Sequence, residues 1–125
     1  MLLVSTAFII IGCSPTRTEI CGKYRADYPA AKEQLVLRSD GTFYQEITLK
    51  KNGEKTKSEG TWSYGSDDDV VTFNEHFIVV TDAYGDVSSD FPEPAKGLVG
   101  LPAESTLGTV YLGVSKGILY TKIGP

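Results

Sequence analysis

Apolar and polar residues alternate with a period of two along most of the chain after residue 20. Leu35 and Leu37 share one face of a predicted strand, and Phe43 and Ile47 share one face of the next, with Gln45 between them. Successive side chains of a strand point to opposite faces of a sheet. The pattern therefore predicts half-buried strands, and it places Gln45 in the interior, where its amide needs a hydrogen-bond partner.

Short turn sequences separate the predicted strands. Asp40-Gly41 and Asn52-Gly53 favour tight hairpins, because Asn, Asp and Gly accept positive φ. The pattern predicts eight strands, at residues 20–25, 33–38, 42–49, 58–64, 70–73, 77–81, 109–114 and 118–123. No segment shows a competing helical period. We therefore expect an all-β fold, an antiparallel up-and-down meander that closes into a small barrel or a partly open one.

Residues 82–106 break the alternation with three prolines and three glycines. A loop of this length is uncommon in a compact domain and often serves as a lid, a binding loop or a cover over a sheet edge. It also carries the apolar residues Phe91, Leu98, Val99 and Leu101. We expect this long loop to pack across an open end of the sheet.

The first twelve residues have the pattern of a targeting signal. Residues 2–11 are uncharged, and as a helix they would reach only about 15 Å, against roughly 30 Å for a bilayer core. The string Ile10-Ile11-Gly12-Cys13-Ser14 resembles the lipobox of bacterial lipoproteins, although no Lys or Arg precedes the apolar run. The resemblance implies a signal peptide at residues 1–12 and acyl chains such as palmitate on Cys13, which becomes the mature N-terminus.

The lipobox interpretation divides the chain into three parts and implies a location. Residues 13–19 are then the lipidated cysteine and a short tether, and residues 20–125 form a single barrel domain. Ser14, rather than Asp, resembles the signal for outer-membrane sorting, which implies the periplasmic face of that membrane in a Gram-negative envelope. The other interpretation of residues 1–12 is a buried strand. Cys21 is expected as a buried small residue, and a Cys13–Cys21 disulfide requires that Cys13 is not lipidated.

Three short motifs resemble a known family. Gly22-Lys23-Tyr24 is similar to the Gly-x-Trp opening of lipocalins, with Tyr in place of Trp. Residues 35–43, which end in Asp-Gly-Thr-Phe, and the later Gly60-Thr61-Trp62 resemble small lipocalin-like domains of bacterial envelope lipoproteins. The resemblance covers most of residues 20–80 and implies a lipocalin-like barrel. The Cys-x-x-Cys of copper- and stress-linked relatives is missing, so their metal or redox role is not carried over.

Composition and charge limit the classes of partner that the chain is expected to bind. The chain has 125 residues, of which 41% are hydrophobic, as expected for one globular domain. Residues 13–60 hold nine Lys or Arg and seven Asp or Glu, whereas residues 61–125 hold three and nine. Binding to a nucleic-acid backbone needs a surplus of cations on one face, so we expect no nucleic-acid partner.

The residues that carry catalysis or bind metals are sparse. His76 is the only histidine; it lies in a predicted turn, and no nucleophile or elbow motif is nearby. One His and one free Cys do not suffice for a closed zinc or copper site. The acidic residues at 67–69, 82, 86 and 90 lack the order of a calcium loop. We therefore predict no enzyme, no catalytic residue, no metal and no cofactor.

Two classes of function fit these observations. Amphipathic aromatics can fill a core or line a pocket for an apolar ligand, and the candidate pocket residues are Tyr24, Phe43, Gln45, Trp62, Tyr64 and Tyr111. The first hypothesis is a membrane-anchored lipoprotein that binds a small apolar or amphipathic ligand. The alternative is a filled barrel that presents a sheet edge or the acidic region 67–93 to another envelope protein. A hydrolase lacks a nucleophile–base pair.

The lysines of one predicted hairpin have two interpretations. Lys50, Lys51, Lys55 and Lys57 surround the Asn52-Gly53 turn. On a lipid-tethered domain they could contact anionic headgroups; the simpler interpretation is a solvated hairpin tip.

Overall fold

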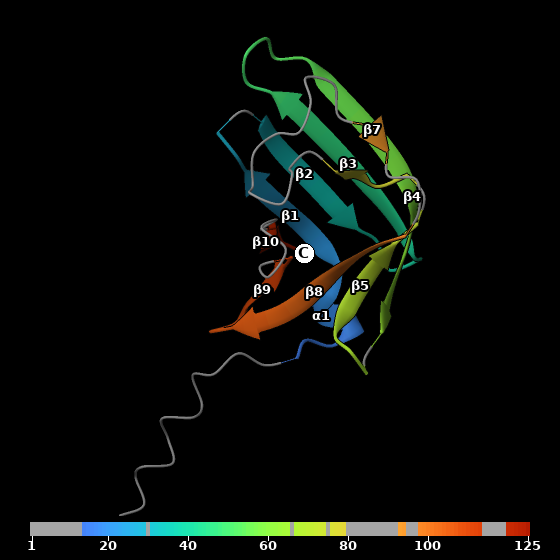
Figure 1. Cartoon of the computed structure of the whole chain (residues 1–125). Helices are drawn as coiled ribbons and strands as arrows, with labels where there is room; N and C mark the ends of the chain where they lie inside the picture. The colour runs from blue at the N-terminus through green and yellow to red at the C-terminus, as the bar shows by residue number, and fades with distance from the viewer. Residues whose placement is uncertain are drawn as a thin grey trace, which may run out of the picture.

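Eight strands close into an antiparallel barrel in the computed structural model, which describes residues 14–29, 31–65, 67–74, 76–79, 93–94, 98–113 and 120–125 (Figure 1). The barrel strands are β1 (Gly22–Asp27), β2 (Ala31–Leu37), β3 (Thr42–Leu49), β4 (Lys55–Gly65), β5 (Val70–Phe73), β8 (Val99–Thr106), β9 (Thr109–Leu112) and β10 (Tyr120–Gly124). Their order around the barrel is β1-β10-β9-β8-β5-β4-β3-β2, and β2 pairs with β1. The predicted all-β meander and its closure are confirmed.

Three short elements lie outside the barrel. The helix α1 (Arg17–Ile20) precedes β1, and β6 (Ile78–Val79) pairs with β7 (Glu93–Pro94) in a separate two-stranded sheet. In the part of the chain that the structure describes, no helix is long and apolar enough to cross a membrane.

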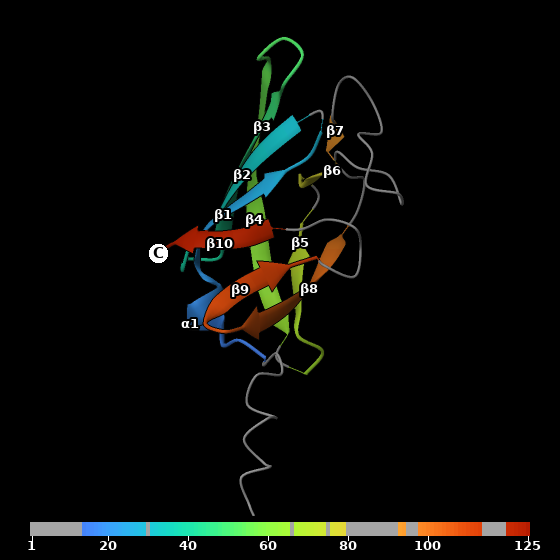
Figure 2. The same cartoon turned by 90° about the vertical axis from the view of Figure 1, so that its left-hand side faces the viewer.

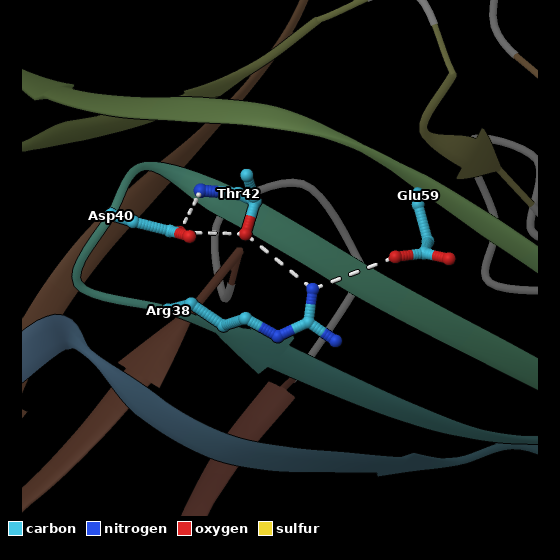
Figure 3. Close-up of polar contacts among 4 residues, drawn as sticks. All are labelled: Arg38, Asp40, Thr42 and Glu59. Atoms are coloured by element: carbon cyan, nitrogen blue, oxygen red, sulfur yellow. Dashed lines mark hydrogen bonds and ion pairs between the residues drawn. The ribbon is translucent and has the colours of Figure 1, made fainter.

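The β2–β3 hairpin shows how local chemistry sets the strand register (Figure 3). Asp40 Oδ1 accepts hydrogen bonds from Thr42 N at 2.9 Å and from Thr42 Oγ1 at 2.7 Å. Gly41 has a φ of 89°, which a side chain would make costly. Arg38 Nη1 lies 3.4 Å from Thr42 Oγ1 and 3.6 Å from the Glu59 carboxylate on β4. These contacts tie three consecutive strands together at this turn.

The barrel has the expected number of strands but not the expected set. Residues 77–81 were expected as a barrel strand; residues 80 and 81 lie outside the described chain, and in the described part Ile78–Val79 is a strand that pairs with β7 outside the barrel. Residues 99–106 were expected within the long loop, and instead they form β8 between β5 and β9. Gly100 and Pro102 conceal this strand in the sequence, because both residues are rare inside strands. Residues 82–92 and 95–97 of that loop, the signal at 1–12 and Cys13 lie outside the described residues.

Apolar side chains from every barrel strand fill the interior. Barrel side chains buried to 1% exposure or less include Tyr24, Leu35, Leu37, Phe43, Ile47, Val71, Phe73, Leu101, Leu112 and Tyr120. Three residues from outside the barrel join them at the same burial: Ile20 from α1, and Phe77 and Ile78 from the segment after β5. Segments at both ends of the barrel therefore contribute to one core.

The two ends of the barrel differ (Figure 2). The α1 end carries α1 and the turns that join β2 to β3, β4 to β5, and β8 to β9; the hairpin end carries the turns that join β1 to β2 and β3 to β4. The β3–β4 hairpin extends beyond the other strands at the hairpin end (Figure 2). Ser14, the first described residue, lies at the α1 end, where its Oγ donates to Asp69 Oδ2 at 2.7 Å.

Gly60 makes room for the central aromatic residue of the core. It lies directly across from Phe43 on β3, and a Cβ at Gly60 would lie 2.7 Å from Cε2 and 3.1 Å from Cζ of the Phe43 ring. Phe43 is held in place by edge-to-face contacts with Phe73, at a centroid distance of 5.3 Å, and with Phe77, at 5.9 Å. The ring therefore has little freedom to move aside.

We expect Gly60→Ala to lower the free energy of unfolding by about 1–3 kcal/mol, because the added methyl overpacks the core. Urea unfolding monitored by circular dichroism measures the change. Gly124→Ala is the control, since a Cβ there meets nothing within 4 Å. Equal stability of the two variants would contradict the tight contact between Gly60 and Phe43.

Candidate functional site

Gln45 is the centre of a buried polar cluster that closes the hairpin end of the interior. Its side chain is fully buried, as the strand pattern predicted. Its Nε2 donates to Glu33 Oε1 at 2.9 Å and to the Ile78 carbonyl at 2.9 Å, and its Oε1 accepts from Ile78 N at 2.8 Å. Tyr120 Oη lies 3.3 Å from the same Nε2. The partners that Gln45 needs are therefore supplied by the chain itself.

Glu33 is a buried carboxyl group within this cluster. The residue is 2% exposed, and its Oε1 accepts from Tyr120 Oη at 2.6 Å as well as from Gln45. Burial raises the pKa of Glu33, and the hydrogen bonds from Tyr120 and Gln45 offset part of that rise. The Tyr28 hydroxyl lies beside the same carboxyl but is buried without a hydrogen bond of normal geometry. An ionised Glu33 is therefore costly in this cluster.

The segment after β5 passes into the interior at this point. Phe77 N donates to the Asn74 carbonyl at 3.2 Å, which closes the tight turn expected there. The Phe77 ring stacks on Phe73 at a centroid distance of 4.2 Å and meets Tyr120 edge-on at 6.2 Å. Gln45 then fixes the backbone of Ile78 through two hydrogen bonds. This part of the interior is filled by the chain's own Phe77 and Ile78.

Tyr64 binds the N-terminal segment at the α1 end. It follows Trp62 on the inward face of β4 and is half-buried. Its hydroxyl donates to the Pro15 carbonyl at 2.7 Å and approaches Asp69 Oδ1 at 3.2 Å. Pro15 is buried, and Ser14 bonds to the same Asp69. Ser14 and Pro15, which belong to the predicted tether, are therefore bonded to the barrel.

Trp62 holds the same segment from inside the barrel. Its Nε1 donates to the Arg38 carbonyl at 2.9 Å. The Arg17 guanidinium lies 4.6 Å from the centre of the Trp62 ring, in a cation–π contact, and also donates to the Ser39 carbonyl at 3.2 Å. Trp62 therefore serves the attachment of α1, which sequence reasoning did not anticipate.

The helix α1 begins with a capping box that the sequence contains as Thr16-Arg17-Thr18-Glu19. Glu19 N donates to Thr16 Oγ1 at 3.2 Å, and Thr16 N donates to Glu19 Oε1 at 2.8 Å. Tyr24 Oη donates to the Ile20 carbonyl at 2.6 Å, so the end of the helix is also bonded to the core. The Thr-x-x-Glu pattern in the sequence is the signal from which this helix start could have been predicted.

The six candidate pocket residues do not form one site. Gln45 belongs to the polar cluster, and Phe43 packs against Phe73 and Phe77. Tyr24, Trp62 and Tyr64 instead hold residues 14–20 at the α1 end. Tyr111 is half-buried on the outer face of β9, opposite Glu104 and Thr121. Sequence reasoning missed Glu33 and Tyr120 as members of the polar cluster. Glu33 lies two residues before Leu35 in the same alternation, so its place on the inward face of the strand could have been predicted from the sequence.

A polar groove lies on the outer face of the barrel. It has a volume of about 440 Å³ and is lined by Arg25, Asp27, Lys32, Glu33, Gln34, Glu46, Thr48 and Lys55. Two ion pairs cross or flank it, Lys55 with Glu46 at 3.1 Å and Lys50 with Asp27 at 2.5 Å. None of the six candidate pocket residues lines this groove. Its charged lining suits a polar partner rather than an apolar ligand.

The remaining candidates of the sequence lie apart from these features. Cys21 is half-buried against the core and carries a free thiol. His76 is exposed in its turn. Within the described ranges, no three His, Cys, Asp or Glu side chains come together as a possible metal site.

Comparisons with protein-family models, with curated protein sequences and with solved structures found no match for this chain. The closed eight-stranded antiparallel barrel is consistent with a lipocalin-like barrel.

Glu33 makes the stability depend on pH in a direction opposite to that of most carboxylates. Its pKa is raised above 4.5 by burial, so the folded state keeps the proton at pH values where the unfolded chain has released it. The free energy of unfolding therefore falls as pH rises through that window, by at most about 1.4 kcal/mol per pH unit.

We expect Glu33→Gln to equal the wild type near pH 4 and to exceed it in stability near pH 8, because the neutral amide oxygen still accepts both hydrogen bonds. Urea unfolding at a series of pH values measures this difference. Glu104→Gln, at an exposed position on β8, is the control. A constant difference in stability between Glu33→Gln and the wild type across the series would show that the pKa of Glu33 is not raised in the folded protein.

Proposed function

We propose that this chain is a lipid-anchored lipoprotein of the cell envelope, and that its filled barrel acts without catalysis, through its surface, as a binding module for another envelope protein. The lipobox-like string that ends at Cys13 and Ser14 supports the anchor. Ser14 after the cysteine supports the periplasmic face of the outer membrane in a Gram-negative host.

The filling of the interior is the observation that favours a binding module over a ligand carrier. The Phe77 ring lies among Phe43, Phe73 and Tyr120, where an apolar ligand of a hollow barrel would lie. Both polar atoms of the Gln45 amide are engaged by the Ile78 backbone. A ligand that entered here would first have to displace this segment and leave buried hydrogen-bonding groups unpaired, at about 1–3 kcal/mol each.

The attachment of residues 14–20 orients the barrel relative to a lipid at Cys13. Ser14 is bonded to Asp69 in the β4–β5 turn, so a lipid on the preceding residue would be attached one residue away from this contact. The bilayer would then lie at the α1 end, and the β3–β4 hairpin would point away from it (Figure 2). The lysines of that hairpin would face the aqueous compartment and not the headgroups.

The surface that faces away from the bilayer is the one we assign to the partner. β4 is longer than β5, so residues 55–60 of β4 pair with β3 on one side and with no described barrel strand on the other, while the Thr61 carbonyl accepts from Asn74 N and Ser58 Oγ donates to the His76 carbonyl. A strand edge that extends beyond its neighbour can pair with a segment of another protein. The polar groove lies on the same part of the barrel, over β1, β2 and β3.

We expect Cys13→Ser, expressed in the native host, to move from the membrane to the soluble fraction and to lose the mass of its acyl chains. Cell fractionation and intact mass spectrometry measure both changes. Cys21→Ser is the matched control and should stay in the membrane fraction. Membrane retention of Cys13→Ser with no change in added mass would refute the anchor.

A photo-crosslinking side chain at Lys57, on the exposed face of β4, should capture a protein in intact cells. Thr18, exposed at the α1 end, is the control position and should capture no protein. Native mass spectrometry of protein extracted from its envelope should show no bound small molecule. A stoichiometric apolar adduct, or the lack of a protein crosslink at Lys57, would overturn the binding module; the adduct would establish a carrier instead.

A further inference from the structure

Leu107 is a large apolar residue at the tip of the β8–β9 turn. Its side chain is 85% exposed, more than Leu98 at 73% or Ile123 at 54%, the other exposed large hydrophobic residues of the described chain. Its φ is 51° and that of Gly108 is 84°. Both central residues of this hairpin turn therefore lie in the left-handed region.

The conformation of this turn does not favour leucine. Two-residue turns with positive φ at both positions prefer Asn-Gly or Asp-Gly, because a short polar side chain tolerates the left-handed region. The other non-glycine residue with a positive φ in the described chain is Asp69, which has such a short polar side chain. Leucine is therefore unfavourable in the backbone conformation of this turn, and the exposed side chain of Leu107 gains no stabilising contact with the core. A side chain that is strained and exposed at once points to a contact outside the chain.

The β8–β9 turn, which carries Leu107, lies at the α1 end of the barrel (Figure 2). Gly108 and Thr109 line a small surface hollow together with Glu19 of α1 and with Lys122. Lys122 Nζ donates to the Glu19 carbonyl at 2.7 Å, which fixes α1 against the neighbouring β10. The tip of the β8–β9 turn is thus held beside the segment that leads back to Cys13.

We infer that Leu107 inserts into the lipid bilayer as a second, apolar contact beside the lipid on Cys13, and so fixes the orientation of the barrel on the membrane. This inference rests on the proposed lipid anchor. Residues 14–20 have no slack, because Ser14, Pro15 and Ile20 are each hydrogen-bonded to the barrel. A lipid at Cys13 therefore brings the α1 end, and Leu107 with it, to the bilayer surface.

The charge at this end identifies the type of bilayer. Asp67 and Asp68 are exposed in the β4–β5 turn, next to Asp69, and Glu19 and Arg17 lie on α1. Asp40, Arg38 and Lys122 also lie at this end, so it carries no surplus of cations that would attract anionic headgroups. We therefore assign the contact to a zwitterionic bilayer, which Leu107 enters through its apolar side chain alone.

The test uses the full lipidated protein in phosphatidylcholine vesicles. A nitroxide is attached at Leu107→Cys and, as the matched control, at Leu98→Cys, both in a Cys21→Ala background. Leu98 precedes β8 at the other end of that strand and is also exposed. We expect the label at 107 to lose accessibility to a water-soluble nickel chelate by about tenfold on the vesicles, as for a group buried below the headgroups. The label at 98 should change by less than about twofold.

The outcomes separate the inference from the proposed function. If intact mass shows acyl chains on Cys13 but both labels stay accessible to the chelate, the inference is wrong and the anchor stands. If Cys13 carries no lipid, the anchor fails and the inference fails with it. Hydrogen exchange of the unsubstituted protein gives the same information without any variant, since the amides of residues 107–109 should exchange more slowly on vesicles than in solution.

Discussion

The two hydrogen bonds between the Gln45 amide and the Ile78 backbone hold Phe77 and Ile78 inside the barrel. Glu33 and Tyr120 complete the cluster. Each of its hydrogen bonds is electrostatically stronger in this low-dielectric site than it would be in water. Because Ile78 is fixed, Phe77 is placed against Phe73, and Phe43 packs between them and Gly60. The aromatic centre of the barrel thus depends on a polar cluster at its edge.

Polar and apolar contacts play different parts at the α1 end. Residues 14–20 add one apolar side chain, Ile20, to the core, and the rest of their attachment is made by hydrogen bonds from Tyr24 and Tyr64 and by the contact of Arg17 with Trp62. These contacts fix the position of residues 14–20 on the barrel more than they add to the stability of the fold. Because residues 14–20 are fixed to the barrel, a lipid at Cys13 would be attached at one defined end. This attachment determines which end faces the bilayer in the proposed anchor.

The alternation of apolar residues and the turn dipeptides were sufficient to predict the all-β meander, the β2–β3 and β3–β4 hairpins and the inward position of Gln45. They did not identify β8, because Gly100 and Pro102 interrupt its pattern, and they placed residues 77–81 in the barrel, because that run is as apolar as a strand. A run of apolar residues is buried in either case. Whether it is buried as a wall strand or as a segment inside the barrel depends on which strand β5 accepts as its neighbour, and that neighbour is β8.

By itself the sequence determined which residues are buried and where the chain turns, because both follow from local properties: the two-residue period of a strand and the backbone freedom of Asp-Gly and Asn-Gly. Only the tertiary structure decided what those buried residues contact. Glu33 and Tyr120 are 87 positions apart, and their hydrogen bond exists only after the barrel has closed β10 against β1. The choice between a hollow and a filled interior is likewise non-local, since it depends on Phe77 and Ile78 entering a space that strands distant in sequence enclose.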